Sequence, residues 1–364
     1  MNNILALMAG VSFLLLGHAD EADAKSPSWY RGNTHTHTIN SDGNAAPDRV
    51  VRWYREHGYH FVFVTDHEYV TDVGPLNELI GARERFVVFA GQEITQWGDD
   101  PKRAAAHVNG LFSTTVIWPV GIRKCLGSGC GAHAPASTSL AETFRTNIAE
   151  IVSQGAIPQI NHPNYRWAVR PEDLADTPDF TLLEIWNGQG RINNLGGEDE
   201  AGVTRPSAEG FWDILLSQGK IIWGVGADDS HDFGDAPDPD GAAPGQAWIM
   251  VRAPELTASA IRRSIERGDF YASTGVELED IRADDASLAL RIAESRPGAA
   301  RFKTRFVGTG GRVLAEAAGT SPVYRFHGGE NYVRAIVTDS NGNQAWTQPV
   351  FRDSRRERVS KRAD

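Results

Sequence analysis

The sequence predicts an α/β protein whose main unit is a barrel of strands and helices, followed by a small all-β unit. Between about residues 30 and 268, apolar runs of strand length alternate with helical patterns, and such alternation is typical of a parallel sheet covered by helices. Seven strands over roughly 240 residues match the size of a β/α barrel, with a doubly wound open sheet as the alternative. After about Thr274 the pattern changes to short β-type runs separated by turn residues.

The predicted strands of the main unit are apolar runs that end in polar residues. They are Arg31–Thr38, Phe61–His67, Phe86–Thr95, Ala156–His162, Phe180–Asn187, Ile221–His231 and Gln246–Ala253. The helical stretches between them are Pro47–His57, Leu76–Arg85, Leu140–Gln154, Ser207–Gln218 and Thr257–Arg267. The segment 96–138 breaks this rhythm with glycine, proline and two cysteines, so we expect a long inserted loop there. The runs Arg301–Val307, Tyr332–Asp339 and Gln344–Phe351 predict the all-β unit.

Both ends of the chain are expected to lie outside the folded units. Ile4–Gly17 is an apolar run of the length of a signal-peptide core, and Ala22–Ala24 offers a small-x-small cleavage site. We therefore expect export to the periplasm or secretion, and no stable membrane insertion, since a spanning helix needs about 20 apolar residues. The expected divisions are a signal peptide at 1–24, the barrel at 25–273, the β domain at 274–354 and a frayed, solvated basic tail at 355–364.

Composition excludes several classes of protein. The chain has 364 residues, 41% of them hydrophobic, which is ample for a sizeable core and excludes global disorder. Its net charge of −11 makes it a poor partner for nucleic acid, and none is expected. Cys125 and Cys130 are close in sequence, and in an exported protein they predict a local disulfide. The pattern specifies no oligomeric state.

Residue types that bind metals stand where the predicted strands end, the edge at which parallel barrels carry their chemistry. His35 and His37 are two residues apart, so on a strand both imidazoles point to one face, and Asp42 follows in a turn. The next strand ends in Asp66 and His67. Because alternation sends these two to opposite faces, we expect His67 to be a ligand and Asp66 to orient a neighbouring imidazole.

The later strands repeat this arrangement. Glu93 stands at the end of the third strand and His162 at the end of the fourth. His107 lies on a short apolar run in the insertion, and we expect it to fold over the barrel mouth. The sixth strand ends in an Asp-x-His pair, whose spacing favours Asp229 over the preceding aspartate as the carboxylate that shares a face with His231.

These residues together predict a metal centre. The candidate ligands are His35, His37, Asp42, His67, Glu93, His107, His162, Asp229 and His231. Nine ligands are too many for one ion and suffice for two or three. Imidazoles and carboxylates without a thiolate suit Zn²⁺, Mn²⁺ or Fe.

The motifs resemble those of the PHP (polymerase and histidinol phosphatase) metallohydrolase family. They are His35-x-His37 with Ser41-Asp42-Gly43, Thr65-Asp66-His67, Glu93, His107, Asn161-His162-Pro163 and Asp229-x-His231, in this order across the barrel only. The resemblance implies a distorted (β/α)7 barrel with two or three metal ions. The amidohydrolase superfamily also opens with His-x-His on a barrel strand, but it shows a bridging lysine and a lone terminal aspartate where this chain has a glutamate and Asp-x-His.

The resemblance also implies how the ligands are shared among the ions. His35, His37, Glu93 and Asp229 would hold one ion. Glu93 would bridge to a second ion, which His107 and His162 would also hold, and Asp42, His67 and His231 would hold the third.

Such a centre predicts a hydrolase of anionic esters. Metal charge would outweigh the three carboxylates and leave a positive pocket on an acidic protein, which favours a phosphate ester. We expect attack of a metal-bridging hydroxide on phosphorus, with Glu93, Asp229 and His231 as the catalytic ligands. A phosphodiester with an organic substituent is favoured because no cluster of lysine and arginine for a dianion stands out.

Other functions stay open at this point. The same centre would suit a phosphomonoesterase or a hydrolase of aryl carbamates or carboxyl esters, and a carbohydrate- or surface-binding protein acting through its β domain is a third class. The expected partner is a small-molecule ester. Tyr165 and Arg166 after the fourth strand, and Asn187 and Arg191 after the fifth, are the candidate substrate-binding residues, although Tyr165 also suits the core.

Overall fold

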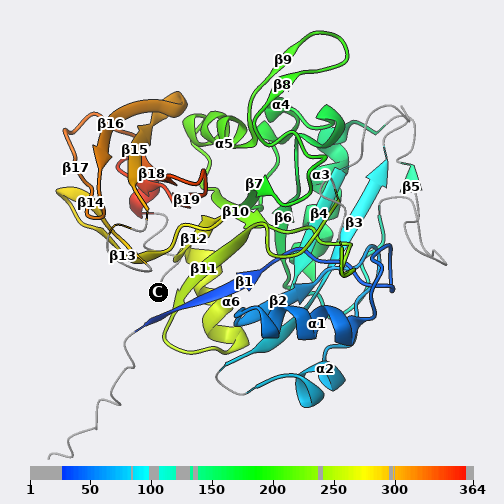
Figure 1. The fold of residues 1–364 in the computed structure, drawn as a ribbon. Coiled ribbons are helices and arrows are strands. Elements are labelled where there is room, and N and C mark those ends of the chain that lie inside the picture. The colour runs from blue at the N-terminus through cyan, green and yellow to red at the C-terminus, as the bar shows by residue number, and fades with distance from the viewer. Residues whose placement is uncertain are drawn as a thin grey trace, which may run out of the picture.

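The computed structural model describes residues 27–82, 85–97, 106–119, 132–133, 138–236, 241–294, 298 and 300–357 (Figure 1). The expected signal peptide at 1–24, Cys125 and Cys130 with their expected disulfide, and the last seven residues of the basic tail lie outside the described residues. Among the helices that are described, none combines the length and apolar character needed to cross a membrane.

One large sheet runs through the molecule in the strand order β10-β7-β6-β4-β3-β2-β1-β11-β12-β19-β18-β15-β16. Its first part consists of β1 (Ser28–Asn33), β2 (Phe61–Val64), β3 (Val87–Trp97), β4 (Ala106–Leu111), β6 (Ile157–Ile160), β7 (Leu182–Asn187), β10 (Trp223–Ala227), β11 (Trp248–Ala253) and β12 (Phe270–Ser273). All four side chains of β2 are buried, which is why this strand is a continuous apolar run.

The sheet mixes parallel and antiparallel strands, and one antiparallel strand lies in the segment that was expected to be an inserted loop. β1–β2, β2–β3, β6–β7 and β7–β10 are parallel pairs. β4, however, lies between β3 and β6 and runs antiparallel to both. The prediction of a loop over 96–138 is therefore wrong at its start, because β3 continues to Trp97 and β4 is a full member of the sheet. Two further residues, β5 (Ala132–His133), pair with β3.

The α/β class is confirmed, but the described strands do not close into a barrel through a continuous ladder. The chain segments beyond β1 and β10 meet instead. Thr36 and Ser230 form an isolated parallel bridge, His37 donates its backbone N–H to the carbonyl oxygen of Ser230 at 2.9 Å, and Asp229 donates to that of His35 at 3.0 Å. These bonds join the segments that follow β1 and β10, two strands far apart in the strand order, at the place where the candidate ligands lie.

The helices cover the sheet and begin where the sequence supplies a cap. They are α1 (Pro47–Glu56), α2 (Gly74–Leu79), α3 (Leu140–Ser153), α4 (Pro171–Ala175), α5 (Ala208–Ser217) and α6 (Ala258–Arg267), with a 3₁₀ turn η1 (Tyr165–Trp167). The side-chain oxygens of Ser139, Ser207 and Thr257 accept a backbone N–H in the first turn of α3, α5 and α6. α6 is capped at its C-terminal end by Gly268, whose φ of 76° suits glycine.

The C-terminal unit packs two sheets around an apolar core. β13 (Leu278–Ala283), β14 (Ser287–Ile292) and β17 (Val323–Arg325) form one sheet. The other contains β15 (Phe302–Gly308), β16 (Arg312–Ala318), β18 (Tyr332–Asp339) and β19 (Gln344–Thr347), with β20 (Val350–Phe351) on β18. Because β19 pairs with β12, this second sheet continues the main sheet. Figure 1 shows the unit at one side of the molecule, beside α5.

Buried arginines fix the C-terminal unit to α5. The guanidinium of Arg334, on β18, donates to the carboxylate of Asp213 at 2.6 and 2.9 Å and to Glu209 at 2.8 Å. Arg355 is only 2% exposed and donates to the carbonyl oxygen of Leu216 at 2.5 Å. The prediction of a solvated tail from residue 355 is therefore wrong for Arg355, because its guanidinium donates to the carbonyl oxygens of Leu216, near the end of α5, and of Lys220.

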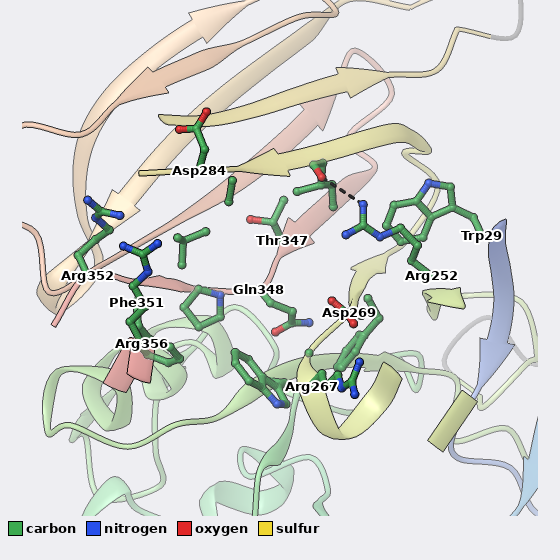
Figure 2. Close-up of a pocket in the computed structure, with 17 residues that line it drawn as sticks. Trp29, Arg252, Arg267, Asp269, Asp284, Thr347, Gln348, Phe351, Arg352 and Arg356 are labelled. Atoms are coloured by element: carbon green, nitrogen blue, oxygen red, sulfur yellow. Dashed lines mark hydrogen bonds between the residues drawn. The ribbon is translucent and has the colours of Figure 1, made fainter. Parts of the chain in front are cut away.

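A pocket of about 320 Å³ lies where the C-terminal unit meets β1, β11 and α6 (Figure 2). It is lined by aromatic side chains and by four arginines, including Arg252 and Arg352. None of the nine candidate metal ligands lines it.

Candidate metal centre

All nine candidate ligands meet at one edge of the sheet. His35 and His37 follow β1, Asp42 lies in the turn before α1, His67 follows β2, Glu93 and His107 lie in β3 and β4, His162 follows β6, and Asp229 and His231 follow β10. They form three groups, and within each group the ligand atoms lie within 4.8 Å of one another. The groups have the members that the PHP resemblance implies, with His37 added to the third.

The first group is a tight set of four ligand atoms that is fully buried. It contains His35, His37, Glu93 and Asp229. The two Nε2 atoms are 3.1 Å apart, and each lies 3.1 to 3.2 Å from one oxygen of Glu93 and one of Asp229. Four ligands placed tetrahedrally at 2.0–2.1 Å from an ion would lie about 3.3 Å from one another. The residues present therefore fit a divalent ion in both chemistry and spacing.

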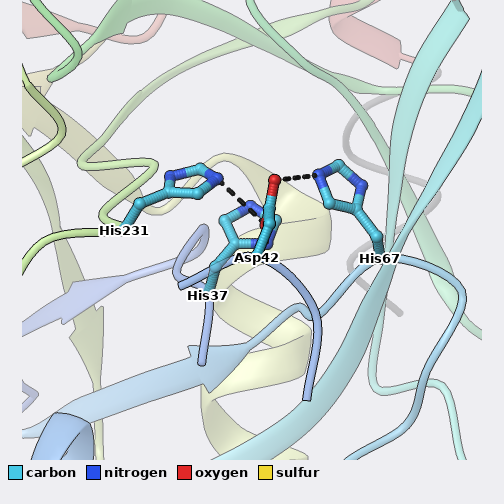
Figure 3. A group of neighbouring side chains, drawn as sticks. All are labelled: His37, Asp42, His67 and His231. Atoms are coloured by element: carbon cyan, nitrogen blue, oxygen red, sulfur yellow. Dashed lines mark ion pairs between the residues drawn. The ribbon is translucent and has the colours of Figure 1, made fainter. Parts of the chain in front are cut away.

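The other two groups adjoin the first. The second Glu93 oxygen lies 2.8 Å from Nδ1 of His107 and 3.5 Å from Nε2 of His162. Figure 3 shows the third group, in which Asp42 stands among three imidazoles. Its oxygens lie 3.5 Å from His37, 3.5 Å from His67 and 3.2 Å from His231. Each oxygen of Glu93 faces a different group, so ions held by the first two groups would be neighbours.

Glu184 is a buried support of this centre that the sequence analysis missed. One carboxylate oxygen lies 2.7 Å from Nδ1 of His35, and the other accepts the backbone N–H of His162 at 2.8 Å. Because Nδ1 of His35 is engaged in this way, Nε2 is left for the ligand group. The available signal was a single acidic residue inside the apolar run of β7.

Neutral side chains hold other ligands in place. Gln189 donates to Asp229 at 2.8 Å, and Asn161 donates to Glu93 at 2.9 Å. The hydroxyl of Thr95 lies 2.7 Å from Nδ1 of His67. For Asp229 and His67 these contacts leave the other carboxylate oxygen or ring nitrogen facing the groups, whereas the Asn161 amide bonds to the same Glu93 oxygen that faces His107. Except for Asn161, which belongs to a quoted motif, these residues were not predicted.

Two expectations about local geometry need correction. His35 and His37 lie beyond the end of β1, and Asp229 lies beyond β10 with a φ of 50°. The preference for Asp229 over Asp228 agrees with the structure, yet a left-handed residue and not strand alternation directs its side chain. Asp228 is buried elsewhere and accepts bonds from Tyr54 and from the backbone of residues 245–247.

Asp66 acts less directly than predicted. Its carboxylate accepts the backbone N–H of Thr38 at 2.7 Å and the hydroxyl of Ser41 at 2.8 Å. The same Ser41 hydroxyl lies 3.3 Å from Nδ1 of His37. Asp66 therefore shapes the loop that carries His37 and reaches this imidazole through Ser41.

The carboxylates raise the pKa of five of the six candidate imidazoles, and His107 is the exception because burial lowers its pKa. Burial by itself lowers the pKa of His35, but Asp229, Glu93 and Glu184 outweigh it and raise this pKa well above its usual value. Burial alone would raise the pKa of Glu93. The imidazoles of His35, His67 and His107 lower it by more, so this pKa lies well below its usual value. The glutamate is therefore ionised, and protons and cations compete for the same nitrogen atoms.

A cavity of about 500 Å³ opens over the ligands. Tyr165 and Arg191 line it, as predicted for substrate-binding residues. Arg166 and Asn187 are not among its described lining residues, and Asn187 lines a neighbouring cavity instead. Arg166 is exposed, whereas Asn187 is buried and donates to Glu184 and, at 3.1 Å, to Asp229.

Comparisons with solved structures return similar chains. A two-domain protein from Bacteroides vulgatus, described as containing a predicted PHP-like metal-dependent phosphoesterase, is 16% identical, with a TM-score of 0.46 over 90% of this chain and 96% of that one. A protein from Bifidobacterium adolescentis whose name describes a metal-dependent phosphoesterase is 16% identical, with a TM-score of 0.38 over 60% and 92%.

A third similar structure is an amidohydrolase from Chromobacterium violaceum with bound sulfate and no metal. It is 14% identical, with a TM-score of 0.34 over 58% of this chain and 93% of that one. Neither the family models nor the curated proteins contain a match to the chain. These three TM-scores are all below 0.5, and the residues of the site alone carry a functional argument.

Proposed function

We propose that the chain is a PHP-type metal-dependent hydrolase that cleaves phosphoric esters, with phosphodiesters favoured. The observation that carries this proposal is the sharing of Glu93 between two adjacent ligand groups. Bound divalent ions, for which we propose Zn²⁺, Mn²⁺ or Fe, supply a deprotonated water near neutral pH and stabilise charge on phosphoryl oxygens. We also propose that the open sheet corresponds to the distorted barrel of that family, and that the leader-like residues 1–24 direct export.

The residues of the chain divide the remaining work. The first group, whose four residues are all buried, would hold one ion, and Glu184 and Gln189 fix the orientation of His35 and Asp229. Asp42 and His231 are the more accessible ligands, since 47% and 22% of their side chains are exposed and both line the cavity. Arg191 also lines the cavity and supplies a guanidinium for a phosphoryl oxygen.

The charge of the cavity wall favours a diester. Arg191 is the one lysine or arginine among its described lining residues, and Asp232 lines the same wall. A single cation offers less compensation for the second charge of a phosphomonoester dianion. A phosphodiester carries one negative charge and leaves two organic substituents to be recognised.

The test compares metal-free and reloaded protein on a substrate panel. Wild-type protein is treated with a chelator, reloaded with Zn²⁺ or Mn²⁺, and assayed on bis(p-nitrophenyl) phosphate, p-nitrophenyl phosphate and a naphthyl carbamate. We expect diester turnover that is lost on chelation and restored by metal. H37A should lose at least about 100-fold in turnover, more than the change of a ligand's support costs, whereas H327A, which changes an exposed histidine of the β unit, should not. Turnover that survives chelation, or carbamate cleavage without phosphate-ester cleavage, would overturn the proposal.

A further inference from the structure

A second cavity of about 880 Å³ adjoins the cavity over the metal ligands. Gln189, Ile192 and Gly241 line both, so the two cavities adjoin along one wall. The second cavity extends past the loop 193–196 to the turn 341–343, which connects β18 and β19 of the C-terminal unit. A substrate whose reacting group sits at the metal ligands would therefore direct a substituent towards the C-terminal unit.

The described wall of this second cavity is uncharged and rich in amides. Its described lining residues include no aspartate, glutamate, lysine, arginine or histidine. Seven of them are amides, namely Asn187, Gln189, Asn193, Asn194, Gln246, Asn341 and Asn343. The cavity over the ligands and the pocket in Figure 2 are both lined by several ionisable groups. The neutral wall thus sets this space apart from its neighbours.

Some of these amide side chains bond to other residues of the protein, and others do not. Asn194 bonds to the backbone of Asn187 at 2.8 and 3.0 Å, and Asn343 donates to Asp339 at 2.9 Å, so these side chains build the wall. Gln246 and Asn341 are exposed, and neither side chain bonds to another residue in the described part of the chain. Their amides are therefore available to a ligand from opposite units of the molecule.

Trp186 adds an apolar surface to this wall. Its ring is half-buried and packs against that of Trp346, with centroids 5.5 Å apart and planes inclined by 32°. The ring is therefore held in position before a ligand enters. A rigid aromatic surface beside amides suits a group that has both C–H faces and polar edges.

We propose that the second cavity binds a neutral, hydroxyl-rich substituent of the ester, such as a sugar or polyol. An amide both donates and accepts hydrogen bonds, as a hydroxyl group does, and the tryptophan offers an apolar surface for C–H groups. A wall without cations gives no compensation for a second anionic group. The inference that this substituent belongs to the substrate rests on the proposed esterase function, whereas binding of the hydroxyl-rich group itself does not.

The first arm of the test measures binding without turnover. Metal-free wild-type protein is titrated with glucose and maltose, and with phenyl phosphate for comparison, by calorimetry and tryptophan fluorescence. We expect saccharide binding that the double variant Gln246→Ala/Asn341→Ala weakens by about tenfold, as the loss of two hydrogen bonds predicts. Asn331→Ala changes an exposed asparagine of the C-terminal unit outside the cavity and is the matched control.

The second arm measures selectivity between esters. It compares kcat/KM for a methyl glucosyl phosphodiester with that for bis(p-nitrophenyl) phosphate, and we expect the double variant to lower this ratio about tenfold and the control to preserve it. If diesters are cleaved but no saccharide binds and the ratio does not change, the inference is wrong and the esterase proposal stands. If saccharide binds in this cavity but no phosphate ester is cleaved, the esterase proposal fails and the saccharide site stands.

Discussion

Replacing Glu184 with glutamine should weaken metal binding by about 10–100-fold, although Glu184 belongs to none of the three ligand groups. The carboxylate is buried, and four donors converge on its two oxygens. One oxygen receives His35 at 2.7 Å and Gln159 at 3.2 Å, and the other receives the backbone N–H of His162 at 2.8 Å and Asn187 at 2.9 Å. A glutamine keeps only one acceptor oxygen, so its amide nitrogen must face one of these pairs of donors.

The direction of the effect follows from the donor that cannot change. The backbone N–H of His162 is always a donor, so the glutamine oxygen should remain on that side and the amide nitrogen should face Nδ1 of His35. Nδ1 would then have to accept, which moves the ring proton of His35 to Nε2, the atom that faces Glu93 and Asp229. A 10–100-fold loss corresponds to about 1.4–2.7 kcal/mol, within the roughly 1–3 kcal/mol expected when a buried bond loses its partner.

The assay is competition with a chromophoric chelator for Zn²⁺ or Mn²⁺, accompanied by thermal unfolding of the metal-free protein. Glu150→Gln, on the exposed face of α3, is the matched control and should bind metal like the wild type. A folded Glu184→Gln protein with wild-type metal affinity would refute the claim that Glu184 selects the tautomer of His35.

Three further predictions concern stability, substrate binding and pH. Asp213→Asn should lower the free energy of unfolding by about 3–5 kcal/mol in urea denaturation, because it leaves the buried guanidinium of Arg334 poorly compensated; a loss below about 1 kcal/mol would contradict this. Arg191→Ala should raise KM for bis(p-nitrophenyl) phosphate about tenfold or more, as expected for a lost charged hydrogen bond, and an unchanged KM would remove Arg191 from the substrate site. Because the pKa of His35 is raised, protons compete with metal near and above the usual imidazole pKa of about 6.5. The apparent metal affinity should therefore increase as the pH rises through this range, with proton release detectable by calorimetry in buffers of different ionisation enthalpy, and a pH-independent affinity would count against the site.

The positions of the candidate ligands were predictable because each has a local signal. His67 and His162 stand within three residues of the ends of apolar runs of strand length. The ends of parallel strands meet at one edge of a sheet, so the sequence order of such residues predicts their proximity. The division of these ligands among the ions came from the PHP resemblance, because the local patterns alone do not contain it.

What the sequence did not predict depends on pairing between distant segments. β4 has His, Asn and Gly among its six residues, a weak strand pattern that becomes regular only between β3 and β6. Arg355 reads as part of a basic tail, yet its guanidinium is buried against the end of α5. Asp229 takes a left-handed conformation that the strand period does not encode. In each case tertiary contacts outweigh the local pattern.

If these ligands hold adjacent metal ions, as we propose, the number of ions bound per chain will show it. Chelated wild-type protein is reloaded with Zn²⁺ or Mn²⁺, freed of excess metal, and measured by elemental analysis beside Glu93→Gln and Glu150→Gln. The shared oxygens of Glu93 predict more than one ion per chain in the wild type and in Glu150→Gln, and at least one ion fewer in Glu93→Gln. A wild-type chain that binds no ion, or a Glu93→Gln chain that binds as many as the wild type, would contradict the account.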